Sequence, residues 1–75
     1  MNTPIDIIVI FDHQGNMTPS YVRLKEEEHK IVQVKLMQDR NYAGIATIDY
    51  LCKLDDGRCI DLMFFVREHK WVIKP

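Results

Sequence analysis

The chain has 75 residues, of which 47% are hydrophobic, and its 10 basic and 11 acidic side chains give a formal net charge of −1. A chain of this length forms one domain, residues 1–75, with a thin core, because only about 60% of its unfolded surface is buried on folding. The apolar content argues against disorder. The nearly balanced charge argues against a general attraction to nucleic acid or to an anionic membrane. We therefore expect a binding face rather than a deep catalytic cleft.

The chain also lacks the sequence features of membrane and exported proteins. No apolar run approaches the ~18 residues needed to cross a bilayer. Residues 1–6 lack the basic and apolar segments of a signal peptide. The sequence therefore predicts a cytoplasmic protein without membrane contact.

The first predicted strand covers residues 5–11. These residues are largely β-branched, and apolar side chains occur at both odd and even positions, so both faces of the strand are apolar. Such a run is typical of a strand that lies centrally in a sheet or is covered on both sides. Residues 12–16 predict a turn. Because Pro19 has no N–H to donate, the next strand is expected to begin pairing after it.

Residues 20–25 and 29–38 are interpreted as the next two strands, joined by a charged hairpin tip. In this interpretation Gln33 and Lys35 point outward. The inward side chains are Val22, Leu24, Val32, Val34 and Leu36.

A helix over residues 19–30 is the alternative for part of this region. Thr18 would be its N-cap and Pro19 its first helical residue. Against it, the apolar side chains of residues 31–36 repeat every two residues, which is the period of a strand.

The strongest pattern is a hairpin over residues 48–66. Apolar and polar side chains alternate on both sides of the turn signal Asp55-Asp56-Gly57. The side chains expected on its inner face are Ile48, Tyr50, Cys52, Leu54, Ile60, Leu62, Phe64 and Val66.

The register of this hairpin follows from its two apolar faces. A three-residue loop with Gly57 in the left-handed region pairs Cys52 with Ile60, so the faces coincide. A two-residue turn would instead place Cys52 opposite Asp61. The first register predicts Cys52 inside and Cys59 outside, so no disulfide is expected.

The remaining elements complete an all-β domain. Residues 39–44 are expected to form the longest loop and residues 68–71 a last tight turn, after which Trp71 and Ile73 close the core beside Val66. The sequence therefore predicts an antiparallel meander of five to six strands, curled into a small half-open barrel that is SH3-like or OB-like in scale. The alternative is a bent sheet packed against a partner.

Short segments across most of the chain resemble a family of small, uncharacterised bacterial proteins, mostly from Firmicutes. The matching segments are Pro4-Ile5 leading to Phe11-Asp12 and Gly15, Pro19-Ser20-Tyr21-Val22-Arg23, Ala43-Gly44, Tyr50-Leu51-Cys52 and Trp71. This chain departs from the family in residues 25–30, which contain no glycine, and in a compressed segment before Trp71. The family has no established activity, so the resemblance implies a β-rich fold and no particular function.

No motif for phosphate binding, metal binding or nucleophilic catalysis stands out. The three glycines are far apart and open no helix, so no phosphate loop is expected. The three histidines fall in different turns, which argues against a metal site; they are His13, His29 and His69. An enzyme hypothesis depends on one exposed thiol, Cys59, with no histidine placed to serve it. We expect no catalytic residue, no metal and no cofactor.

One candidate surface lies on the outer side of the central hairpin. Leu51, Met63 and Phe65 are large apolar residues on the parity that should face water. Apolar patches of this kind often mark contact sites. The sequence therefore predicts a protein partner or self-association, unless the first strand or the long loop covers these residues.

A second candidate surface combines one aromatic side chain with basic and amide groups. Such a composition on a sheet is typical of platforms for single-stranded nucleic acid. Its residues are Tyr21, Arg23, Ile31, Gln33 and Lys35. A single aromatic residue and the acidic tip at residues 26–28 argue against it. We therefore expect a non-catalytic protein-interaction module, with weak nucleic-acid binding as the alternative.

Overall fold

The computed structural model describes residues 3–74, and all regular structure in them is β-strand. The strands are β1 (Thr3–Pro4), β2 (Asp6–Phe11), β3 (Met17–Leu24), β4 (Glu27–Tyr42), β5 (Ile45–Leu54), β6 (Cys59–Phe65) and β7 (Lys70–Ile73). The helix considered over residues 19–30 is wrong, because β3 and the start of β4 occupy this region. The described residues include no helix with the length and apolar character needed to cross a membrane.

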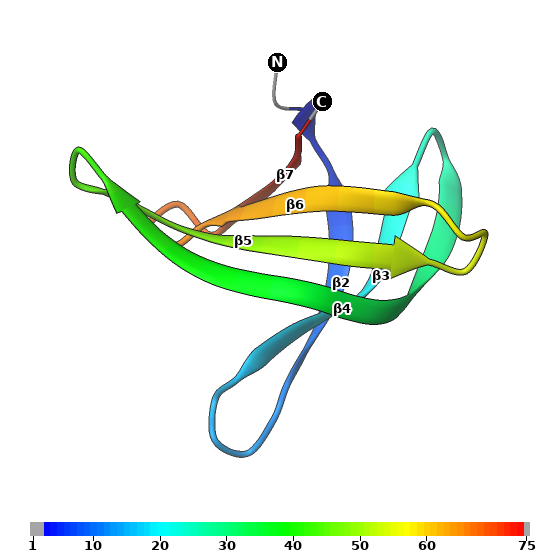
Figure 1. The fold of residues 1–75 in the computed structure, drawn as a ribbon, viewed down its shortest axis with the longest axis horizontal. Coiled ribbons are helices and arrows are strands. Elements are labelled where there is room, and N and C mark those ends of the chain that lie inside the picture. Colours follow the sequence, from blue (N-terminus) through cyan, green and yellow to red (C-terminus); the bar gives the residue numbers. More distant parts are fainter. Residues whose placement is uncertain (1–2, 75) are drawn as a thin grey trace.

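The strands form one antiparallel sheet in the order β1-β7-β6-β5-β4-β3-β2. Strands β1 and β2 lie at opposite ends of this order, although only Ile5 separates them in the chain. Because this one segment pairs with β7 and then with β3, the sheet curls into a half barrel (Figure 1). The backbone N–H of Ile5 donates a hydrogen bond to the carbonyl oxygen of Trp71 at 3.2 Å. The expected curled β sheet is confirmed, with seven strands rather than five or six.

Strand β2 is not the central strand that its sequence predicts. It is the last strand in the sheet order and pairs only with β3. Ile7 and Val9 pack against the core, but Ile8, Ile10 and Phe11 are 54%, 57% and 64% exposed. β-Branched residues favour an extended backbone even where one face is open, so apolar content alone did not indicate burial here.

Strand β4 contains two irregularities that change which side chains point inward. Its register against β5 shifts between Ile31 and Gln33 and again between Val34 and Leu36. Each shift is a bulge, which adds one residue and interrupts the alternation. Val34 therefore packs against the core as expected, but Val32 and Leu36 are 52% and 57% exposed, and their inward assignment is wrong. Ile31, expected on the outer side, is buried.

The central hairpin has the predicted register. Cys52 lies opposite Ile60 in the ladder between β5 and β6. The backbone N–H of Leu54 donates to the carbonyl of Arg58 at 2.8 Å, and Gly57 donates to the carbonyl of Leu54 at 3.1 Å. Gly57 has a φ of 91°, a conformation that glycine adopts without steric cost. The three-residue loop and the inward position of Cys52 are therefore confirmed.

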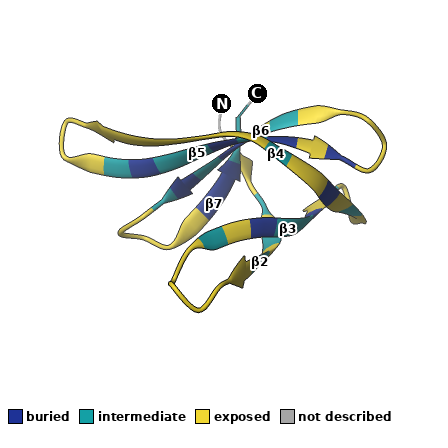
Figure 2. Ribbon diagram, turned by 60° about the horizontal axis from the view of Figure 1, so that its bottom comes forward, coloured by how far each residue is buried: buried dark blue, intermediate teal, exposed yellow. Residues whose placement is uncertain are grey.

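The core lies between the curled strands. Burial is concentrated along β5, β6 and β7, while the hairpin tips are exposed (Figure 2). The ring of Trp71 packs against Tyr50 and Phe64, with centroids 5.3 and 4.9 Å apart. Trp71 and Ile73 close the core as expected, but Val66 is 37% exposed and lies outside it. The buried cluster consists of Val22, Ile31, Tyr50, Cys52, Leu54, Leu62, Phe64 and Trp71.

Candidate interaction surfaces

Leu51, Met63 and Phe65 lie on one face of the sheet, as their parity predicts. Alternation along β5 and β6 directs them away from the core residues Tyr50 and Leu62. All three predicted residues are half-buried rather than fully exposed. The apolar surface therefore exists, but these three residues form its inner part.

The exposed part of this surface comes from residues that the sequence analysis did not assign to it. The expected loop at residues 39–44 is not a loop: residues 39–42 are the end of β4, and Ala43 and Gly44 form a two-residue turn into β5, with φ values of 53° and 80°. These residues therefore extend the face instead of covering it. Leu36, Tyr42 and Ile45 lie on this side of the sheet at 57%, 83% and 54% exposure. The outer face, as used below, consists of Leu36, Tyr42, Ile45, Leu51, Met63 and Phe65.

An ion cluster around a nearly buried carboxylate lies within this apolar surface. Asp49 is paired with Met63 across the ladder, and its side chain is only 13% exposed. Its Oδ2 atom lies 2.9 Å from Arg40 Nε and 2.9 Å from Lys74 Nζ. Its Oδ1 atom is buried and has no hydrogen-bond partner among the described residues. A carboxylate held in this way is costly to desolvate and fixes the long side chains of Arg40 and Lys74 over the face.

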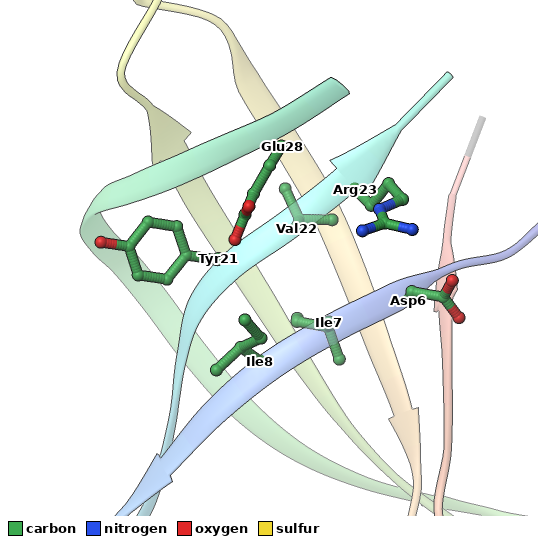
Figure 3. Close-up of a pocket in the computed structure, with 7 residues that line it drawn as sticks. All are labelled: Asp6, Ile7, Ile8, Tyr21, Val22, Arg23 and Glu28. Carbon is green, nitrogen blue, oxygen red and sulfur yellow. The ribbon is translucent and has the colours of Figure 1, made fainter. Parts of the chain in front are cut away.

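The second predicted surface contains a shallow hollow of about 180 Å³ on β2, β3 and β4. Tyr21 borders one side and Arg23 lies beside Asp6 on the other, with the Glu28 side chain between them (Figure 3). In the ladders, Arg23 lies opposite both Asp6 and Glu28. Two carboxylates beside the only arginine in this hollow disfavour the approach of a phosphate group.

Of the other three residues of that predicted surface, Ile31 is buried, and Gln33 and Lys35 lie elsewhere on β4. Strand β3 pairs with β4 only as far as Lys30, opposite Tyr21. Gln33 lies beyond this point and pairs with Lys53 on β5, and both Gln33 and Lys35 are exposed. The structure brings Tyr21 and Arg23 together and leaves Gln33 and Lys35 on the part of the sheet that contains β5.

A polar cluster between two hairpins was not anticipated from the sequence. His29 on β4 contacts the β5–β6 loop, with its Nδ1 atom 3.3 Å from Asp55 Oδ1. Arg58 donates to His29 Nε2 at 3.4 Å and forms an ion pair with Asp56 at 2.6 Å. Because a guanidinium only donates, the ring hydrogen of His29 is assigned to Nδ1. The hydrogen bond from the Arg58 backbone N–H is the main cause that lowers the pKa of Asp56.

The candidate chemical groups do not gather into a reactive centre in the part of the chain that the structure describes. Among residues 3–74, no three His, Cys, Asp or Glu side chains are placed to hold a metal ion. Cys59 is exposed and lies opposite Lys53 in the ladder. The guanidinium of the neighbouring Arg58 is held by Asp56.

Comparisons of this chain with protein-family models, with curated proteins and with solved structures give no match.

Proposed function

We propose that this chain is a small interaction domain without catalytic activity, which associates through its outer face with a second copy or with another protein. The observation that supports this most directly is the exposed group Leu36, Tyr42 and Ile45 beside the half-buried predicted residues. Water is excluded from such a surface when a partner covers it, which favours association. The half barrel is SH3-like or OB-like in scale. A domain of this size has little room for a deep cleft, so a partner is expected to bind on its outer surface.

The edge of β4 supports self-association in particular. Beyond Lys30, β4 pairs with β5 on one side, and β3 does not continue along its other side. An open edge that carries apolar residues can add a strand from another chain. Leu36 and Met37 on this edge are each 57% exposed. A dimer joined at β4 would extend the sheet and bring two outer faces next to each other.

The test is a charge placed on the outer face without loss of the fold. We expect Met63→Glu and Leu36→Glu to abolish association in sedimentation or light-scattering measurements, with an unchanged far-ultraviolet circular dichroism spectrum. Ile8→Glu is the matched control, because Ile8 is 54% exposed on β2, away from the outer face. If Ile8→Glu dissociates the complex equally, or if Leu36→Glu unfolds the domain, the proposed surface is wrong.

Capture of lysate proteins on the immobilised domain separates this function from nucleic-acid binding. Retained protein that survives nuclease treatment is expected for the outer face. Retention that disappears with nuclease, with an affinity that falls steeply with salt, would instead favour the surface at Tyr21 and Arg23.

A further inference from the structure

A larger hollow, of about 450 Å³, lies at one end of the half barrel, separate from the outer face. Its lining residues come from β1, the β3–β4 hairpin, the β5–β6 loop and the end of β7. Its volume is within the range of small-ligand sites. We call it the end pocket.

The floor of the end pocket is apolar. Ile5, Leu24 and Ile73 line it, and all three are partly buried residues that pack against the core cluster. The open end of the core is therefore the floor of the pocket. An aliphatic group placed there would remove apolar surface from water on both sides of the contact.

The wall of the end pocket is mainly basic. Arg23, Lys25 and Arg58 line it, and Glu27 is its only acidic residue among those that the structure describes. Arg58 already forms an ion pair with Asp56 through Nε, and a second nitrogen of its guanidinium reaches His29. Within residues 3–74, Lys25 has no carboxylate within the 4.0 Å that defines an ion pair. Arg23 contributes less, because it lies opposite Asp6 and Glu28 in the ladders. The wall therefore presents Lys25 and Arg58 as the cationic groups that an anion can approach.

The turn that supplies Lys25 has a strained backbone. Lys25 and Glu26 form the two-residue turn between Leu24 and Glu27, with φ values of 49° and 67°. Glycine is favoured at such positions, because side chains other than glycine lose energy there. The turn places a lysine beside the pocket.

We propose that the end pocket binds an aliphatic carboxylate. The carboxylate lies between Lys25 and Arg58, where charge-assisted hydrogen bonds are available. The aliphatic chain lies on Ile5, Leu24 and Ile73. This combination disfavours amines, which the cations repel, and short anions, which leave the apolar floor uncovered.

The experiment is a titration of the isotope-labelled protein followed by amide chemical shifts. Hexanoate is expected to give saturable shifts at residues of the end pocket. Hexanamide and acetate, which lack the charge and the chain respectively, should bind at least about tenfold more weakly. Equal binding of hexanamide, binding of acetate as tight as that of hexanoate, absence of saturable shifts, or shifts confined to other surfaces would each overturn the proposal.

Two substitutions in one turn provide a matched pair. Lys25→Gly and Glu26→Gly both place glycine at a positive φ, so both are expected to fold. Only Lys25 lines the end pocket. Lys25→Gly should weaken hexanoate binding about fivefold, whereas Glu26→Gly should leave it unchanged or slightly tighter. Equal affinities of the two variants would contradict the role of Lys25.

Discussion

The hydroxyl group of Tyr50 on β5 donates a hydrogen bond to the backbone carbonyl oxygen of Met17 on β3, with a distance of 3.3 Å between the two oxygen atoms. This bond joins two strands that are not neighbours in the sheet. It therefore links the opposite walls of the half barrel across its inner side. Burial, followed by the nearby Asp39 and Cys52, raises the pKa of Tyr50, which keeps the hydroxyl protonated and able to donate.

Removal of this hydroxyl should weaken the closed form of the half barrel. Tyr50→Phe is expected to lower the free energy of unfolding by about 1 kcal/mol, the usual value of one such hydrogen bond. Urea denaturation measures the change. Tyr42→Phe is the control, because Tyr42 is 83% exposed, and it should change stability by less than about 0.5 kcal/mol. Similar losses in both variants would show that the bond to Met17 contributes nothing.

Stability should decrease in alkaline solution. Burial, followed by the charge of Asp61, raises the pKa of Cys52 from 9.0 to about 11. The unfolded chain then loses its thiol proton at a lower pH than the folded chain does. This contribution is therefore complete below pH 9.0 and is lost as the pH rises to about 11. The shift at Tyr50 acts in the same direction.

Urea midpoints measured between neutral pH and about pH 11 check this expectation. Cys52→Ala should be less stable at neutral pH, because it leaves a cavity. Its loss of stability with pH should nevertheless be shallower than that of the natural sequence. An unchanged slope would mean that Cys52 does not determine the alkaline transition.

The bulges in β4 predict opposite outcomes for two neighbouring valines. Val32 is 52% exposed, and Val34 packs against the core cluster. Val32→Lys should change the free energy of unfolding by less than about 0.5 kcal/mol, whereas Val34→Lys should cost about 2 kcal/mol or more. Thermal or urea unfolding measures both. Comparable losses of stability in the two variants would show that Val32 and Val34 both face the core, as a strand without bulges predicts.

The two thiols should differ strongly in reactivity. Cys59 is exposed, whereas Cys52 is buried with a pKa raised to about 11. In the native protein, an alkylating reagent should therefore modify one thiol quickly and the second only after unfolding. Mass spectrometry identifies the modified residue. A free peptide cysteine provides the reference rate, and a much faster reaction at Cys59 would revive the hypothesis of a nucleophilic enzyme.

The central hairpin was predictable because its signals are local. Gly57 and the alternation on both sides of it determine the loop, the register and the inward position of Cys52. The edge position of β2 was not predictable, since the same residues suit either an open or a covered strand. The bulges in β4 likewise have no compositional signature, and they displaced Val32 and Leu36 from their expected face.

The candidate sites show the same division between local and distant signals. Parity alone identified Leu51, Met63 and Phe65, because they belong to one hairpin. Leu36 was missed because of a bulge, and Tyr42 because its segment suggested a loop. The end pocket combines segments from both ends of the described chain, and no local pattern indicates such a meeting.

The separation of β1 from β2 at Ile5 also has a consequence for how the domain folds. Five of the strand pairings join consecutive strands and form hairpins, but Thr3 pairs with Ile73 at the far end of the described chain. That pairing closes a long loop, which is entropically costly and slows the search for the native topology. It also requires β7, which is synthesised after the other six described strands. We therefore expect a hairpin ribbon to form first, and the half barrel to close only after synthesis of β7, by capture of β1.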